Sequence, residues 1–266
     1  HLPVDCDMAI VAVLDMPARD DDSALSVIAR SSALPVVPVT GEATIERGRV
    51  YLAAPRHEPE ILAGVIRTDR RAAGTYSIDR FFRALADAYQ SRAIAVVLSG
   101  AGSDGASGLA RVREQGGVTL AQSPLDADHG AMPRAAIAAG SVDFVLPAAD
   151  IARRLLALGD SPGRWRSDPA NVEARGQADD SQALADIMDV LRMRTRHDFS
   201  HYKPATLLRR IGRRLHLNGL PDLAAYRDHL REHAEETAPL LQDLLISVTS
   251  FFRNRAAMQS LERNVL

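Results

Sequence analysis

The sequence has a single cysteine, few aromatic residues and no long apolar run. One cysteine, Cys6, excludes a disulfide framework and any cysteine-based zinc site, so we expect a reducing compartment such as the cytoplasm. Because no run reaches about 18 apolar residues, neither a membrane-spanning helix nor membrane insertion is predicted. Residues 1–7 do not form a signal peptide and are typical of a loop that enters a strand.

Lysine is also nearly absent, since Lys203 is the only lysine among 32 basic residues. Arginine suits planar, bidentate contacts to carboxylates, although codon bias gives the same preference. The net charge of −2 conceals an asymmetry along the chain. Residues 181–266 hold thirteen Arg or Lys against ten Asp or Glu, so this part is basic and the remainder is acidic.

Short apolar runs alternate with amphipathic stretches over residues 9–158. The apolar runs predict strands at 9–14, 36–39, 50–53, 93–98, 117–121 and 142–146. The stretches with helical spacing predict helices at 20–32, 78–89, 106–115 and 133–139. This alternation favours a doubly wound parallel sheet, and we therefore assign residues 1–158 to one α/β domain.

A Gly-, Pro- and charge-rich stretch without apolar periodicity occupies residues 159–180 and is interpreted as a linker. From residue 181 onward every segment has helical spacing, with helices expected at 183–194, 205–218, 223–232 and 238–248. Pro204 stands in the first turn of the second of these helices, and Gly219 follows its last turn, which are typical positions for both residues. Residues 181–266 are therefore predicted to form a small all-α domain.

The stretch 99–105, Ser-Gly-Ala-Gly-Ser-Asp-Gly, joins the predicted strand 93–98 to the predicted helix 106–115. It follows the carboxyl end of a parallel strand, where open α/β sheets build their sites. Asp104 is either the N-cap of the following helix or a carboxylate that orients a histidine in a Ser-His-Asp triad. A nucleotide-binding loop is less well supported, because the third glycine of the dinucleotide fingerprint and a Gly-Lys-Ser/Thr sequence are missing.

Four stretches of the first domain carry specific motifs, namely 49–55, 77–83, 95–106 and 130–137. In this order they resemble the catalytic domain of the chemoreceptor methylesterases (CheB type), over roughly residues 9–158. Members of that family hydrolyse methyl esters of receptor glutamates and deamidate glutamines with a serine, a histidine and a loop aspartate. The resemblance implies that Asp104 is the triad aspartate.

The same resemblance implies a damaged catalytic set. The family's histidine aligns with the second residue of Leu14-Asp15-Met16-Pro17, so Asp15 occupies the histidine position. An aspartate cannot relay a proton from serine to the leaving group as an imidazole does near neutral pH. The family's serine lies on a Gly-rich turn upstream of residue 1, and no serine turn elsewhere in the sequence replaces it. We therefore predict that the first domain does not hydrolyse esters.

Other candidate groups in the first domain have ordinary interpretations. His57 and His129 lie in predicted loops, where histidines are usually just solvated. The three aspartates at 20–22 stand at a predicted helix start, where a solvated cluster favoured by the helix dipole is a better interpretation than a metal site. No metal is predicted.

Positive charge is concentrated in residues 192–214, where Asp198 is the only acid. The cations are Arg192, Arg194, Arg196, Lys203, Arg209, Arg210, Arg213 and Arg214. The last four recur at helical spacing and share one side of the predicted helix 205–218. A solvated charged face is the usual interpretation of such a pattern, but this excess of uncompensated charge predicts an anionic partner. Nucleic acid is the less favoured partner, because aromatic residues are few and no nucleic-acid motif appears.

Residues 197–203, 206–214 and 244–254 resemble the N-terminal helical domain of the chemoreceptor glutamate methyltransferases (CheR type). The resemblance implies that the basic helix contacts acidic methylation helices of a receptor or signalling partner. The residues implied in this contact are Lys203, Arg209, Arg210, Arg213 and Arg214. It also implies an S-adenosylmethionine site bordered by Thr249, Phe251, Phe252 and Arg253. No cofactor is expected to bind this chain alone, because no cofactor domain follows.

The order of the two domains is similar to that of the fused CheB–CheR proteins of bacterial signalling. We expect an interaction and regulatory role in receptor methylation, with neither domain catalytically complete. Two alternatives stay open. The first domain is an active protein-glutamate methylesterase and deamidase once a serine turn is supplied, or the chain is a nucleic-acid-binding module.

Overall fold

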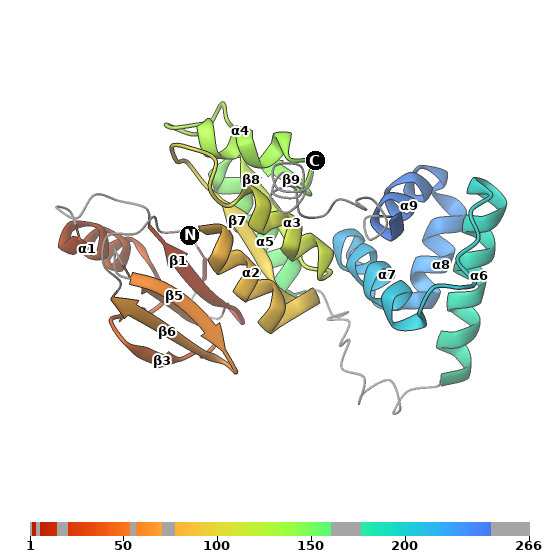
Figure 1. Ribbon diagram of the computed structural model, residues 1–266, viewed down its shortest axis with the longest axis horizontal. Coiled ribbons are helices and arrows are strands. Elements are labelled where there is room, and N and C mark those ends of the chain that lie inside the picture. The colour runs from red at the N-terminus through yellow and green to blue at the C-terminus, as the bar shows by residue number, and fades with distance from the viewer. Residues whose placement is uncertain are drawn as a thin grey trace, which may run out of the picture.

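The computed structural model describes residues 2–3, 6–14, 21–53, 57–70, 78–160 and 177–245. Figure 1 shows two bodies side by side, an α/β domain that runs to residue 160 and a helical domain that begins at residue 177. This division confirms the predicted order of an α/β domain and an all-α domain. Among the described helices, none combines the length and the apolar character that crossing a membrane requires.

Two parallel three-stranded sheets form the centre of the first domain, with the orders β1-β4-β2 and β7-β8-β9. Their strands are β1 Ala9–Val13, β2 Val36–Val39, β4 Arg49–Ala53, β7 Ile94–Val97, β8 Val118–Gln122 and β9 Phe144–Leu146. In the first sheet Val50 lies between Ile10 and Val36, and in the second β8 is buried at every position. Continuous apolar runs suit parallel strands, because helices cover both faces of such sheets.

Helices alternate with these strands along the chain, except between β2 and β4, which no helix separates. They are α1 Asp21–Ser31, α2 Ile78–Tyr89, α3 Ala106–Glu114, α4 Ala131–Ala138 and α5 Ala148–Asp160. A short 3-10 turn, η1 Gln90–Arg92, connects α2 to β7. The prediction of a parallel α/β fold is confirmed by this alternation and by the parallel pairing of the strands.

A third sheet is antiparallel, with the order β3-β6-β5, and was missed by the apolar pattern. Its strands are β3 Glu42–Thr44, β5 His57–Leu62 and β6 Val65–Arg70. Ala63 and Gly64 connect β5 to β6 with φ angles of 49° and 79°, which is the geometry of a tight hairpin turn. Since His57 begins β5, the prediction that it lies in a loop is wrong. The strand was hidden because it is polar and contains Pro59, which only an edge strand tolerates.

Helices α2 and α3 pack directly on each other in the core of the first domain. Phe81 and Phe82 of α2 lie in one apolar cluster with Leu109 and Val112 of α3. Gly108 allows this approach, since a Cβ atom there would lie 2.7 Å from Cβ of Phe82 and 2.9 Å from the backbone of the residue at position 79. The predicted helix 78–89 is confirmed at both ends.

The second domain consists of helices around a core of its own. They are α6 Gln177–Thr195, α7 Pro204–Asn218, α8 Leu223–Glu232 and α9 Thr237–Leu245, with a 3-10 turn, η3 Ala234–Glu236, before α9. One cluster buries Ile187, Ile211, Tyr226 and Leu240 from the four helices. Gly219 ends α7 in the left-handed region, with φ of 67°, as its position in the sequence predicts.

The ends of the predicted linker are helical. Helix α5 continues through Asp160, and α6 begins at Gln177, whereas the prediction placed the linker at residues 159–180. The central part, residues 161–176, lies outside the described residues. Figure 1 shows α7 as the helix of the second domain that faces the first domain.

Candidate functional site

The Gly-rich loop 99–105 connects the carboxyl end of β7 to the start of α3, as the sequence predicts. Gly105 has a φ of 89°, and a Cβ atom on it would lie 3.1 Å from the Ile78 side chain. Both the backbone conformation and the close approach therefore require glycine at this position. The loop brings the start of α3 against the start of α2.

Asp104 caps α2 rather than α3. Its Oδ2 atom accepts the backbone N–H of Ile78 at 2.6 Å, and its Oδ1 atom accepts those of Asp79 at 3.0 Å and Gly105 at 2.9 Å. The N-cap of α3 is Gly105, which provides no side-chain cap. Of the two interpretations that the sequence leaves open for Asp104, the cap of the following helix is therefore wrong, because the loop turns the carboxylate towards the orphan amides of a helix earlier in the chain.

Asp79 makes the reciprocal contact, which no motif in the sequence predicts. Its Oδ1 atom accepts the N–H of Gly108 at 2.7 Å, and its Oδ2 atom accepts the hydroxyl of Ser107 at 2.9 Å. Arg83 in turn donates to the Ser107 hydroxyl at 2.7 Å. The signal for this contact was an acidic residue in the first turn of α2, which by itself indicates only a favourable helix dipole.

The other side of the loop is fastened to the segment between β8 and α4. The Gln122 side chain accepts the N–H of Ser99 at 2.8 Å and donates to Asp126 Oδ2 at 2.8 Å. The N–H of Gly100 donates to the carbonyl of His129, whose own N–H donates to the Ser99 hydroxyl. The N–H of Ala148 and the amide of Gln122 favour the ionised form of Asp126, and hold its pKa below the usual range.

The described side chains do not include the residue at the histidine position of the triad. Asp15, at the predicted histidine position, lies outside the described residues. His129 is exposed in its loop, and the interactions above involve its backbone. Of the predicted acidic cluster, residue 20 and the side chains of residues 21 and 22 likewise lie outside the described part of the structure. The side chains that are described include no group of three or more His, Cys, Asp or Glu arranged to hold a metal ion.

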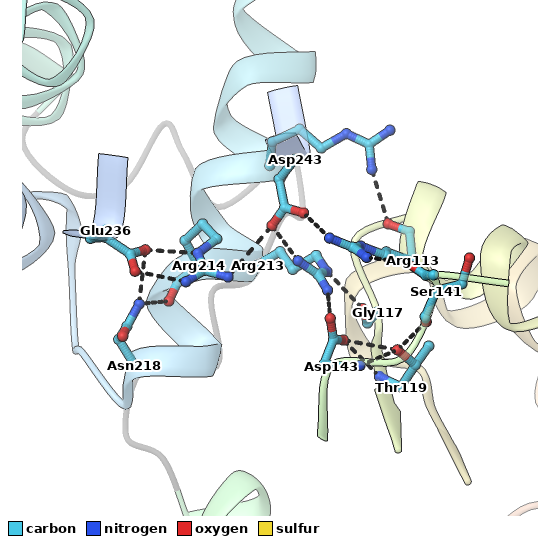
Figure 2. Close-up of polar contacts among 12 residues, drawn as sticks. Arg113, Gly117, Thr119, Ser141, Asp143, Arg213, Arg214, Asn218, Glu236 and Asp243 are labelled. Atoms are coloured by element: carbon cyan, nitrogen blue, oxygen red, sulfur yellow. Dashed lines mark hydrogen bonds and ion pairs between the residues drawn. The ribbon is translucent and has the colours of Figure 1, made fainter. Parts of the chain in front are cut away.

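Three α7 arginines, Arg209, Arg210 and Arg213, contact the first domain, and Figure 2 shows Arg213 between two carboxylates. Arg213 is 1% exposed; it pairs with Asp143 of the first domain and with Asp243 of α9, and its Nε atom donates to the carbonyl of Gly117 at 3.1 Å. Asp143 is itself held by the N–H and the hydroxyl of Thr119, at 2.9 Å and 3.0 Å. The first domain thus presents an oriented carboxylate to α7.

A second arginine enters this network from the first domain. Arg113 of α3 donates to Asp243 Oδ1 at 2.9 Å, so one carboxylate of α9 joins arginines from both domains (Figure 2). Charge-assisted hydrogen bonds of this kind are stronger than neutral ones. The pairing connects residues 113, 143, 213 and 243, and none of the individual sequence patterns predicts it.

Arg214 is compensated within the helical domain. Its Nε and Nη2 atoms donate to the two oxygens of Glu236, each at 2.7 Å, and Tyr226 donates to the same carboxylate at 2.9 Å. Burial alone would lower the pKa of Arg214, but the hydrogen bonds and charge of Glu236 outweigh it and raise the pKa above the ordinary value.

Arg209 and Arg210 meet neutral oxygens of the first domain. Arg209 donates to Gln115 Oε1 at 3.2 Å, and Arg210 donates to the carbonyl of Arg113 at 2.9 Å. Burial lowers the pKa of Arg209, and it lowers the pKa of Arg210, which is 2% exposed, to about 10. The premise that the α7 arginines lack compensating acids is therefore wrong for Arg213 and Arg214, whose acids come from distant parts of the chain.

Lys203 differs from the other predicted contact residues because it is exposed, at the N-cap position of α7. Arg192 and Arg196, near the end of α6, are exposed as well. The residues predicted to border a cofactor site, Thr249, Phe251, Phe252 and Arg253, lie outside the described residues.

Known proteins match both domains. A family model described as "CheB methylesterase" matches residues 1–155, and one described as "CheR methyltransferase, all-alpha domain" matches residues 182–245. The chain therefore consists of a methylesterase-type α/β domain followed by a methyltransferase-type helical domain. The chain belongs to the CheB methylesterase family, and both resemblances seen in the sequence are confirmed.

Individual relatives agree with this assignment. An uncharacterised 104.1 kDa protein in the hypE 3′ region of Rhodobacter capsulatus is 37% identical over 91% of this chain, which spans 27% of that protein's length. A putative protein-glutamate methylesterase/protein-glutamine glutaminase of Leptospira interrogans is 33% identical over 59% of this chain and 83% of its own length. The crystal structure of the Thermotoga maritima CheB methylesterase catalytic domain matches this chain with a TM-score of 0.54 and 28% sequence identity. The match covers 59% of this chain and 87% of the Thermotoga chain.

Proposed function

We propose that this chain is an interaction and regulatory part of a CheB–CheR fusion, which acts in chemoreceptor methylation signalling in the cytoplasm. The observation that carries the proposal is the succession of a CheB-type domain and a CheR-type all-alpha domain in one chain. The first domain is a scaffold without esterase activity. The second binds acidic helices of a receptor or signalling partner, for methylation by a further domain.

The hydrogen bonds of Asp104 give it a structural role in the scaffold that we propose. Its two oxygens accept three backbone N–H groups, so capping α2 is a sufficient reason for an aspartate here. Asp15 stands where the family resemblance expects the histidine, and a carboxylate is a poor general base for a serine near neutral pH. Asp104 thus has a structural role that does not depend on a triad.

Methanol release from methylated receptor glutamates tests whether the first domain lacks esterase activity. We expect none from the chain, and none from a longer form that supplies a Gly-rich serine turn upstream of residue 1. A CheB-type methylesterase with an intact triad is the positive control. Turnover by the longer form that disappears when its serine is changed to alanine would support the alternative, an active methylesterase and glutaminase.

We propose that the acidic partner first meets the exposed cations of the helical domain, Arg192, Arg196 and Lys203. Within the described parts of the chain, no salt bridge joins any of the three to an acid, although the charge of Asp198 acts on Arg192 at longer range. A helix with carboxylates at helical spacing offers complementary charge to them. The S-adenosylmethionine site implied by Thr249, Phe251, Phe252 and Arg253 remains part of the proposal, and no step through that cofactor follows from the described residues.

Binding of an acidic helical peptide and of duplex DNA, each over a salt series, separates the receptor-type partner from nucleic acid. We expect the peptide to bind and the triple variant Arg192→Ala, Arg196→Ala, Lys203→Ala to bind it at least about tenfold more weakly. The matched control removes three exposed arginines of the first domain, Arg30, Arg47 and Arg153. Unchanged affinity in the first triple variant, or stronger binding of DNA, contradicts the proposal.

A further inference from the structure

The contact between the two domains is polar, although each domain has an apolar core. Among the described residues, Leu217 is the only one that joins an apolar cluster of the other domain. Arginines provide hydrogen bonds across this contact. Arg154, for example, donates to the carbonyl of Leu217 at 2.9 Å. Domain contacts that bury little apolar surface are typical of domains that separate reversibly.

The anionic ligand that the first domain offers to α7 is Asp143. Its side chain is 6% exposed, and Thr119 fixes it in place for Arg213 (Figure 2). This arrangement is that of a carboxylate recognised by a guanidinium group, which is also how an acidic partner helix would be recognised.

Arg209 is poorly satisfied by the same contact. Its Nη1 atom donates to the neutral amide oxygen of Gln115 at 3.2 Å. Its Nε atom is buried without a hydrogen-bond partner in the described part of the structure. Its aliphatic stem lies against Gly116, where a Cβ atom would be 3.1 Å from Arg209 Cγ. A partly buried guanidinium group whose hydrogen bond goes to a neutral oxygen would be better stabilised by a carboxylate that it contacts directly.

We infer that α7 carries a single anion-binding face with two alternative occupants, the Asp143 edge of the first domain and an acidic helix of a partner. The inference rests on the proposed function, which supplies the acidic helix. While the domains are in contact, the first domain covers Arg210 and Arg213, so the partner reaches these side chains only after the domains separate. The first domain therefore controls access to the helical domain.

The test measures the affinity of a helical peptide with glutamates at i, i+4 spacing for the chain and three variants. Asp143→Asn removes the first-domain charge that pairs with Arg213, leaves the pair with Asp243 of α9, and retains an oxygen for the Thr119 N–H. We expect it to bind the peptide at least about tenfold more tightly than the unchanged chain. Gln115→Glu gives Arg209 a carboxylate inside the domain contact, and we expect it to bind the peptide more weakly.

The control is Asp128→Asn, which removes the same charge from an exposed loop and should leave the affinity unchanged. Circular dichroism checks that each variant is folded, and Gln115→Glu decides the question if Asp143→Asn is not. If the chain and both interface variants bind equally well, the competition is overturned and the proposed function stands. If none of the four proteins binds the peptide, the acidic partner itself is overturned.

Discussion

Two aspartates tie the starts of α2 and α3 together. Asp104 precedes α3 but accepts amide protons from α2, and Asp79 belongs to α2 but accepts the N–H of Gly108 in α3. Each carboxylate lies at the positive end of a helix dipole and satisfies amides that have no partner within their own helix. This role exists whether or not the loop takes part in catalysis.

Replacing Asp104 by alanine should therefore destabilise the first domain. We expect the free energy of unfolding to fall by about 1–3 kcal/mol, because the amides of Ile78 and Asp79 lose their acceptor in a partly buried place. Urea unfolding measures the change. Asp128→Ala, at an exposed loop position, should stay within about 0.5 kcal/mol of the unchanged protein. An unchanged free energy of unfolding in Asp104→Ala would mean that the carboxylate has no structural role.

Tyr226 provides a pH-dependent test of the helical core. Burial, and then the negative charge of Glu236, raise the pKa of Tyr226 far above its ordinary value. A raised pKa in the folded state contributes stability that is present below the pKa of an unfolded tyrosine, about 10, and is lost as the pH rises above it. Absorbance at 295 nm should show that Tyr226 ionises only when the domain unfolds. Tyr226→Phe should lack this late step, and ionisation of Tyr226 in the folded protein near pH 10 would contradict the assignment.

At the scale of elements, the contact of α2 with α3 depends on Gly108. Alanine in a helix is favoured over glycine by about 1 kcal/mol, so helix propensity alone predicts that Gly108→Ala stabilises the protein. The added Cβ would however meet the Asp79 backbone at 2.9 Å, which cannot rotate away as a side chain can. Overpacking of this kind costs about 1–3 kcal/mol, so the close contact should prevail.

We expect Gly108→Ala to lower the melting temperature and to loosen the first turn of α2, as hydrogen exchange would show. The control is Gly41→Ala, where no atom lies within 4 Å of the added Cβ and φ is ordinary. That change should be neutral or slightly stabilising. A stabilised Gly108→Ala would show that the two helices can move apart at little cost.

At the scale of the whole molecule, two separate cores meet through arginines. The core of the helical domain includes Leu240, which is fully buried. Leu240→Ala should destabilise that domain by about 2–5 kcal/mol, because it leaves a cavity. Hydrogen exchange should then accelerate in α7 and α9, while the amides of β8 keep their protection. Equal loss of protection in β8 would mean that the two domains unfold as one unit.

Local features of the sequence determined much of this protein. Apolar spacing predicts the helix at 78–89 and the succession of buried strands and helices, and the backbone preference of glycine predicts the end of α7 at Gly219. Both kinds of signal act within a few residues. The two family resemblances depend on contiguous motifs, which are local in the same way, and both are confirmed. The antiparallel hairpin of β5 and β6 was missed because its polar sequence resembles a loop.

Only the tertiary structure decided the partners of the charged groups. From the sequence, Asp104 is either a cap for the helix that follows it or a triad aspartate, and the α7 arginines lack acids. In the folded chain, Asp104 reaches back to α2, and Arg213 lies between Asp143 and Asp243, which are 70 and 30 residues away along the chain. Helical spacing places these side chains on a face, but burial and pairing depend on which distant segment covers that face. That choice is made by packing of the whole chain, and local patterns do not contain it.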